Sequence, residues 1–109
     1  MKTLALIAAL ALAHGDHAKV AEPDKRPPVE PSATADEIWK ARCQACHEKG
    51  KRLEELRSAS WHKMHDDASI RWSIENGAAG TKMKAFKGKF SEEQLDGLVA
   101  KIRSFQPKP

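Results

Sequence analysis

The segment Cys43-Gln44-Ala45-Cys46-His47 contains both cysteines of this 109-residue chain. On a helix, Cys43 and Cys46 are three residues apart and His47 is four residues after Cys43, so we expect all three side chains on one face. Two thiols and an imidazole that point the same way can hold one planar ligand from one side. This spacing constrains the fold more than any other feature, because the rest of the chain must enclose whatever the three side chains bind.

The C-x-x-C-H spacing is typical of covalent haem attachment, with two thioether bonds to the haem and the histidine on the iron. Other chemistries stay open from the residues alone. A dithiol redox pair needs a βαβ context, and the sequence shows no alternating strand pattern. His62 and His65 could join the two cysteines in a Cys2His2 zinc site. A disulfide within the motif would leave His47 unexplained.

The size and composition of the chain favour a cofactor-stabilised domain. Its length allows one domain, and charged residues make up 31% of it whereas aromatic residues make up only 6%. An ordered part of roughly 70 residues is marginally stable without a staple or a cofactor. A covalently bound haem would supply the largest apolar object of such a core.

The N-terminus has the features of a secretory signal peptide, predicted over residues 1–21. Lys2 supplies a positive charge, and the apolar run over residues 4–12 is too short to span a bilayer but suits a signal sequence. Cleavage is expected between Ala13 and Ala21. We therefore predict a periplasmic or otherwise exported protein, and no transmembrane span.

The distribution of proline divides the remainder into three parts. Residues 22–34 are predicted to form a proline-rich linker, with prolines at Pro23, Pro27, Pro28 and Pro31. No proline follows until the C-terminal tail, residues 107–109. The interval 35–106 is therefore predicted to be the folded haem domain.

The folded domain is predicted to be all-α, with about four short helices. The first and the last begin at capping boxes, Thr34-x-x-Glu37 and Ser91-x-x-Gln94. The first helix is expected to continue through the cysteine motif. The last helix has the clearest apolar periodicity of the chain, at Leu95, Leu98, Val99 and Ile102.

Two shorter elements are expected between these helices. Leu53 and Leu56 indicate a short helix or turn. A further helix is expected to begin at Asp66 or Asp67 and to end at Gly77, since glycine suits the left-handed position that follows a helix.

A haem that transfers electrons without binding substrate needs a second axial ligand. Met83 lies in a glycine-containing loop over residues 78–90, far enough from His47 in sequence to approach from the opposite face. A thioether ligand favours ferrous iron, and His/Met ligation raises the reduction potential. The alternatives are the other sulfur and imidazole side chains of the folded part, Met64, His62 and His65.

In these features the chain resembles the class I c-type cytochromes over residues 35–105. The matching pieces are Ile38-Trp39, the cysteine motif, Ile74-Glu75-Asn76-Gly77, Gly80-Thr81-Lys82-Met83-Lys84-Ala85-Phe86 and the amphipathic last helix. The resemblance implies a cytochrome c-like fold around one haem c, held by Cys43 and Cys46, with His47 proximal and Met83 distal. It implies an electron carrier, or an electron-transfer subunit of a larger oxidoreductase, and no catalytic residues.

The chain departs from that family at three positions. Lys84 follows Met83 where the family usually has proline, and residues 48–56 lack the proline whose carbonyl orients the proximal histidine. Ala35 replaces a glycine at the helix crossing, where Gly97 and Phe105 are expected to share the packing. A weak Met83 bond would give the alternative function, an open-site haem protein with peroxidase-like or small-ligand-binding activity.

Two further groups of residues complete the predicted site. The haem pocket is expected to include the aromatic residues Trp39, Trp61, Trp72 and Phe86. Lysines flank the Met83 loop and are predicted to steer an acidic redox partner, at Lys82, Lys84, Lys87 and Lys89. Nucleic acid is not an expected partner, since the sequence has no basic and aromatic platform.

Overall fold

The computed structural model describes residues 20–107 of the chain. The predicted signal peptide lies outside these residues except for its last two positions. No helix within the described residues is long and apolar enough to cross a membrane.

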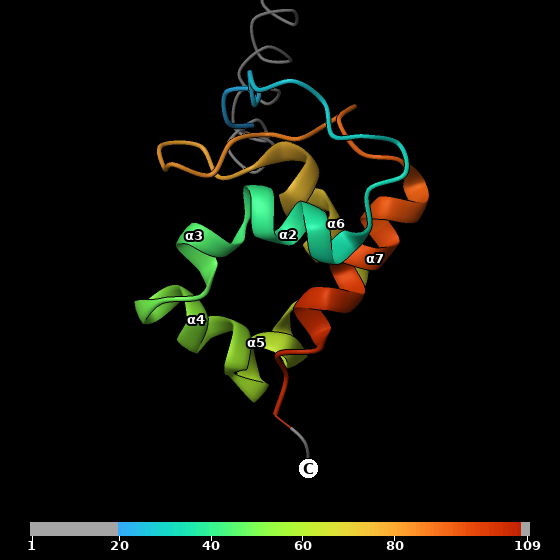
Figure 1. The fold of residues 1–109 in the computed structure, drawn as a ribbon. Coiled ribbons are helices and arrows are strands. Elements are labelled where there is room, and N and C mark those ends of the chain that lie inside the picture. The colour runs from blue at the N-terminus through green and yellow to red at the C-terminus, as the bar shows by residue number, and fades with distance from the viewer. Residues whose placement is uncertain (1–19, 108–109) are drawn as a thin grey trace, which may run out of the picture.

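The described residues form an all-α fold, as predicted, and Figure 1 shows the helices arranged around a common centre. The only extended pairing in this part of the chain is an isolated bridge between Pro23 and Ala85. The helices are α2 (Ala35–Arg42), α3 (Gln44–His47), α4 (Gly50–Arg57), α5 (Ala59–Met64), α6 (Asp67–Asn76) and α7 (Glu92–Arg103).

The helix expected through the cysteine motif is interrupted, which corrects the prediction of one continuous helix. Cys43 has φ −123° and ψ −41°, so α2 ends at Arg42 and α3 begins at Gln44. The amide of His47 still donates to the carbonyl of Cys43 at 3.0 Å. The motif therefore keeps one helical turn of its own, although it is not the continuation of α2.

The predicted helix starts are confirmed. Both capping boxes form, at Thr34 and at Ser91, and Asp66 caps α6 through the amide of Ser69. Helix α5 was not predicted, because it is only six residues long and has no apolar periodicity. Its start is marked by Ser58, whose side chain accepts from the amide of Trp61.

The centre of the core is the crossing of α2 and α7, visible in Figure 1. Ile38 and Leu98 are its most deeply buried side chains, each 1% exposed. The backbones approach so closely that a Cβ at Gly97 would lie 2.9 Å from the Cβ of Ala35. This contact confirms the crossing role predicted for Gly97. The Phe105 ring, just beyond α7, packs against Trp39, with 5.3 Å between the two ring centroids.

The end of α7 is fixed to α5 by a single arginine. Arg103 donates to the carbonyls of His62 and His65 at 3.1 and 2.6 Å, and its Nε lies 2.9 Å from a carboxylate oxygen of Asp67. His62 is 4% exposed, and its Nε2 lies 2.5 Å from the carbonyl oxygen of Leu56. The other ring nitrogen, Nδ1, lies 3.0 Å from Nη1 of Arg103, so both ring nitrogens of His62 have a hydrogen-bond partner.

Residues 21–33, which we call the N-terminal strap, cross the top of the fold in Figure 1 and lie beside the loop 78–90. Most of the strap was predicted to be a linker. In the structure its far end is held by the buried Gln94, whose side-chain amide donates to the carbonyls of Glu30 and Ala33 at 3.0 and 3.2 Å.

Candidate cofactor site

Two adjoining cavities lie between the cysteine motif and the Met83 loop. The outer one has a volume of about 610 Å³ and the inner one about 220 Å³. The outer volume alone is within the range typical of small-molecule and cofactor sites. Both cavities are lined by Cys43, His47, Arg52, Met83 and Phe86. The structure thus brings the predicted attachment residues and the predicted distal ligand to one space.

The attachment wall is formed by α3 and the residue before it. Cys46 is exposed on the outer cavity, whereas Cys43 is half-buried between α2 and α3. Burial raises the pKa of the Cys43 thiol to about 11, against the smaller opposing effects of Arg26 and Arg42. The thiol is therefore protonated at neutral pH.

His47 has the protonation state that a metal ligand needs. Burial, assisted by the positive charge of Arg52, lowers the pKa of His47 below its ordinary value. The imidazole is therefore neutral at neutral pH and keeps a lone pair for a metal ion. Its ring lies 6.0 Å from that of Trp39.

Trp39 links the first helix to the end of the motif. Its indole Nε1 donates to the carboxylate of Glu48 at 2.6 Å, and the indole itself is 3% exposed. Because Glu48 directly follows His47, this bond fixes the position of α3 against α2. No local sequence pattern indicates this pair, since the two residues are nine positions apart.

The opposite wall is a tight turn that carries Met83. The amide of Ala78 donates to the carbonyl of Met83 at 3.1 Å, and the amide of Met83 donates to the hydroxyl of Thr81 at 3.1 Å. Gly77 has φ +65°, and a Cβ there would lie 2.6 Å from the carbonyl oxygen of Lys84. Glycine at position 77 therefore permits the loop to return directly over the end of α6.

The predicted pocket aromatics divide into two groups. Trp39, Trp61 and Phe86 line the inner cavity. Trp72 lines neither cavity and is 42% exposed, so the structure does not support its assignment to the pocket. The helical period explains the difference, because Ile70 and Ile74 occupy the buried face of α6 and position 72 falls between them.

The alternative axial ligands occupy different environments. Met64 is 79% exposed, and His62 is engaged by Leu56 and Arg103. His65 does line the inner cavity, with its ring stacked on Trp61. Among residues 20–107 there is no group of three or more acidic, histidine or cysteine side chains that could hold a metal ion.

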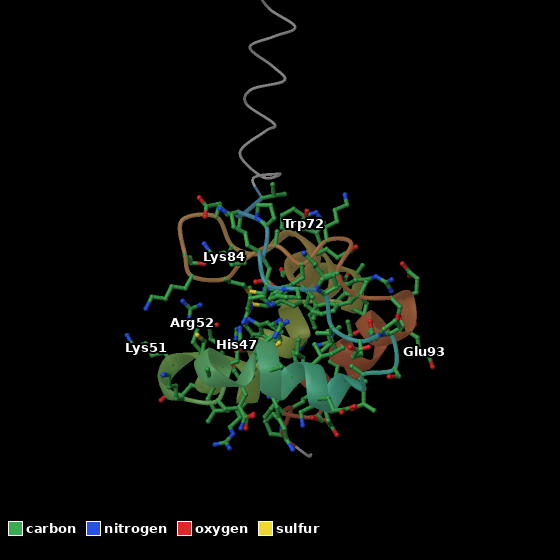
Figure 2. All side chains as sticks on the ribbon, turned by 45° about the horizontal axis from the view of Figure 1, so that its top comes forward. His47, Lys51, Arg52, Trp72, Lys84 and Glu93 are labelled. Carbon is green, nitrogen blue, oxygen red and sulfur yellow. The ribbon has the colours of Figure 1, made fainter. Side chains whose placement is uncertain are left out.

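The mouth of the outer cavity is strongly cationic. Of the four predicted docking lysines, Lys82 and Lys84 line it and Lys87 and Lys89 do not. Figure 2 shows Lys84, Arg52 and Lys51 on the same side of the molecule as His47, with Glu93 on the opposite side. The prediction missed the other cations that line this cavity, Arg26, Arg42, Lys49 and Arg52. Proximity to the motif could have indicated Arg42 and Arg52, whereas Arg26 comes from the strap.

The residues present fit a haem. Its apolar ring requires an apolar interior, which the inner cavity provides with Leu56, Ile74, Leu98 and Ile102. Its two carboxylates require cations, which the outer cavity provides. The donor set of two thiols, a neutral imidazole and a thioether matches covalent attachment and axial ligation.

Comparison with known proteins gives one family. The model of the family described as "Cytochrome C oxidase, cbb3-type, subunit III" matches residues 30–100. No curated protein and no solved structure matches the chain. The matched segment includes the cysteine motif, α2 to α6 and the Met83 loop, and it ends within α7.

Proposed function

The chain belongs to the family described as cytochrome c oxidase, cbb3-type, subunit III, and we propose that it transfers single electrons through a haem with His47 and Met83 as axial ligands. Membership makes it a c-type cytochrome, a protein of haem-based electron transfer that carries covalently bound haem c. The bound haem supplies a one-electron ferric/ferrous couple. The chain's own residues hold, enclose and orient it.

The observation that carries the proposal is the position of Met83. It lines both cavities together with His47, yet it comes from a separate loop. With haem bound, a soft, neutral thioether from Met83 and a neutral imidazole from His47 would give a closed iron site. Such a site favours outer-sphere electron transfer, either as a separate carrier or as the electron-transfer subunit of a larger oxidoreductase.

The matched pair Met83→Ala and Met64→Ala tests this ligation. We expect the oxidised protein to show the weak far-red absorption band of methionine ligation, and we expect Met83→Ala to abolish it and to lower the reduction potential. Met64→Ala should change neither, because that side chain is exposed. A band that survives Met83→Ala would contradict the proposal and would move attention to His65, which also lines the inner cavity.

We propose the cationic mouth of the outer cavity as the surface that receives an acidic redox partner. Opposite charges speed encounter and salt weakens the effect. Hexacyanoferrate(III), a small anionic oxidant, serves as the probe. Its rate of oxidation of the ferrous protein should fall with ionic strength, and this dependence should weaken in Lys82→Gln/Lys84→Gln but not in the control Lys63→Gln. An equal salt dependence in all three proteins would remove Lys82 and Lys84 from the docking surface.

Export is the remaining part of the proposal, and it rests on the sequence of residues 1–21. Cell fractionation should recover the haem-bearing protein in the periplasm. Mass spectrometry of that protein should find its first residue between His14 and Glu22. Recovery of the full-length chain from the cytoplasm would contradict this part alone.

A further inference from the structure

The N-terminal strap is joined to the Met83 loop by backbone hydrogen bonds. The amide of Ala85 donates to the carbonyl of Glu22 at 2.9 Å, and the amide of Asp24 donates back to the carbonyl of Ala85 at 2.9 Å. The amide of Ala21 donates to the carbonyl of Asn76 at 2.8 Å. The strap therefore contacts the chain on both sides of Met83.

Asp24 is the buried charge of the strap. The residue is 5% exposed, and its carboxylate lies 2.7 Å from Nε of Arg26 and 3.7 Å from Nε of Arg42. Arg42 also donates to the carbonyl of Pro27 at 3.0 Å. A buried carboxylate is stable only when it is paired in this way. Asp24 thus connects the strap to the end of α2, directly before Cys43.

The two arginines held by Asp24 belong to the cofactor site. Both line the outer cavity together with Met83. The Arg26 guanidinium also lies over the ring of Phe86, 6.0 Å from its centre. Through these contacts one carboxylate connects the strap, the end of α2 and the Met83 loop.

We propose that Asp24 is a positioning residue, and that the strap it anchors holds the Met83 loop closed over the cavity. Opening of the loop has to break the two hydrogen bonds between Ala85 and the strap. The ion pairs of Asp24 keep the strap in place. The strap compensates for Lys84, which gives the loop none of the rigidity of a proline. Residues 21–29 precede the segment matched by the family model, so this part of the strap lies outside the matched domain.

The effect of the strap on the iron rests on the proposed ligation by Met83, whereas its effect on loop opening does not. The test therefore uses two independent readouts on the haem-bearing protein. The first is hydrogen exchange of the Ala85 amide, which reports loop opening. The second is the affinity of the ferric protein for added imidazole, which must displace Met83. The variant is Asp24→Asn, and its control is Asp36→Asn, an exposed aspartate of α2 that pairs with Lys101 at 3.2 Å.

In Asp24→Asn we expect the Ala85 amide to exchange roughly tenfold faster and imidazole to bind roughly tenfold more tightly, since charged hydrogen bonds to the strap are lost. The Leu98 amide, in the core of α7, should exchange as before. Asp36→Asn should change neither readout. Unchanged exchange at Ala85 would overturn the proposal, and so would an equal acceleration at Ala85 and Leu98, which would mean general destabilisation.

A second variant covers the case in which Asp24→Asn does not fold. Glu22→Gln removes the exposed ion pair between Glu22 and Lys84, 3.1 Å apart, without touching a buried group. We expect about a twofold increase in the exchange rate of the Ala85 amide, because surface ion pairs contribute little. No change in this variant would contradict the proposal that the strap holds the loop closed. Faster Ala85 exchange with unaltered imidazole affinity would support the role of the strap in holding the loop closed. It would contradict ligation of the iron by Met83 instead.

Discussion

The attachment wall of the cavity comes from one stretch, Cys43 to Glu48, whereas the Met83 wall depends on the end of α6, on the loop 78–90 and on the N-terminal strap. On the first wall, one helical turn brings the thiols and the imidazole together. On the second, hydrogen bonds between segments distant in sequence determine where the thioether lies. Changes to the first wall should therefore act locally and on attachment, and changes to the second should act on ligation and on loop opening.

Removal of both thiols is expected to give the largest difference between changes to the attachment wall and changes to the Met83 wall. Cys43→Ala/Cys46→Ala can form no thioether, so acid–organic extraction should remove all haem from the variant. Met83→Ala is the control, because the thioethers do not involve the Met83 wall and its haem should stay with the protein. Haem that resists extraction in the double variant would show that attachment uses another residue.

Gly77→Ala is expected to have the next largest effect, and it acts on the Met83 wall. The new Cβ would lie 2.6 Å from the Lys84 carbonyl oxygen and 2.7 Å from that of Met83, on a residue with φ +65°. Backbone strain alone costs about 1–3 kcal/mol, and the clash adds displacement of the loop. We expect the far-red band to weaken strongly while the haem remains covalently bound.

Gly80→Ala separates strain from contact in this prediction. Gly80 also has positive φ, +79°, but a Cβ there would meet nothing within 4 Å. The control should therefore lose stability from strain without losing the band. If both variants retain the band equally, the close approach at Gly77 does not position Met83.

Gly97→Ala should disturb the crossing of α2 and α7, on which both walls of the cavity depend. Its Cβ would lie 2.9 Å from that of Ala35, and overpacking of this kind costs about 1–3 kcal/mol. The better helix propensity of alanine offsets about 1 kcal/mol of it. We expect a free energy of unfolding lower by about 1 kcal/mol in denaturant titration, with an unchanged spectrum. Adding Ala35→Gly should restore part of the lost packing, and a double variant less stable than the sum of both changes would contradict this geometry.

The difference between the walls also explains what the sequence could predict. The cysteine motif, the capping boxes at Thr34 and Ser91 and the cap at Asp66 are local patterns, and the predicted helix starts agree with the structure. The break at Cys43 was missed because spacing alone does not distinguish one long helix from two short ones. Trp72 was assigned to the pocket by residue type, although its neighbours Ile70 and Ile74 occupy the buried face.

The strap is the clearest example of what local patterns cannot show. Proline and charge in residues 22–34 predict an extended segment, and the described part is extended apart from its turns. Where such a segment lies depends on contacts that no short window contains, such as Asp24 with Arg42 and Gln94 with the Glu30 carbonyl. The cationic contribution of Arg26 to the cavity was missed for the same reason.

The smallest effect is expected from Glu48→Ala, which removes the acceptor of the Trp39 indole on the attachment wall. Glu48 is exposed, so water can replace part of the bond, and a net loss of only about 0.5 kcal/mol in unfolding free energy is expected. Glu54→Ala, at an exposed glutamate of α4, is the matched control and should change stability less. Because the bond fixes α3 and not the Met83 loop, Ala85 exchange should stay as in the unmodified protein. Faster exchange at Ala85 in Glu48→Ala would mean that the two walls are coupled through α2, and the separation between them would then fail.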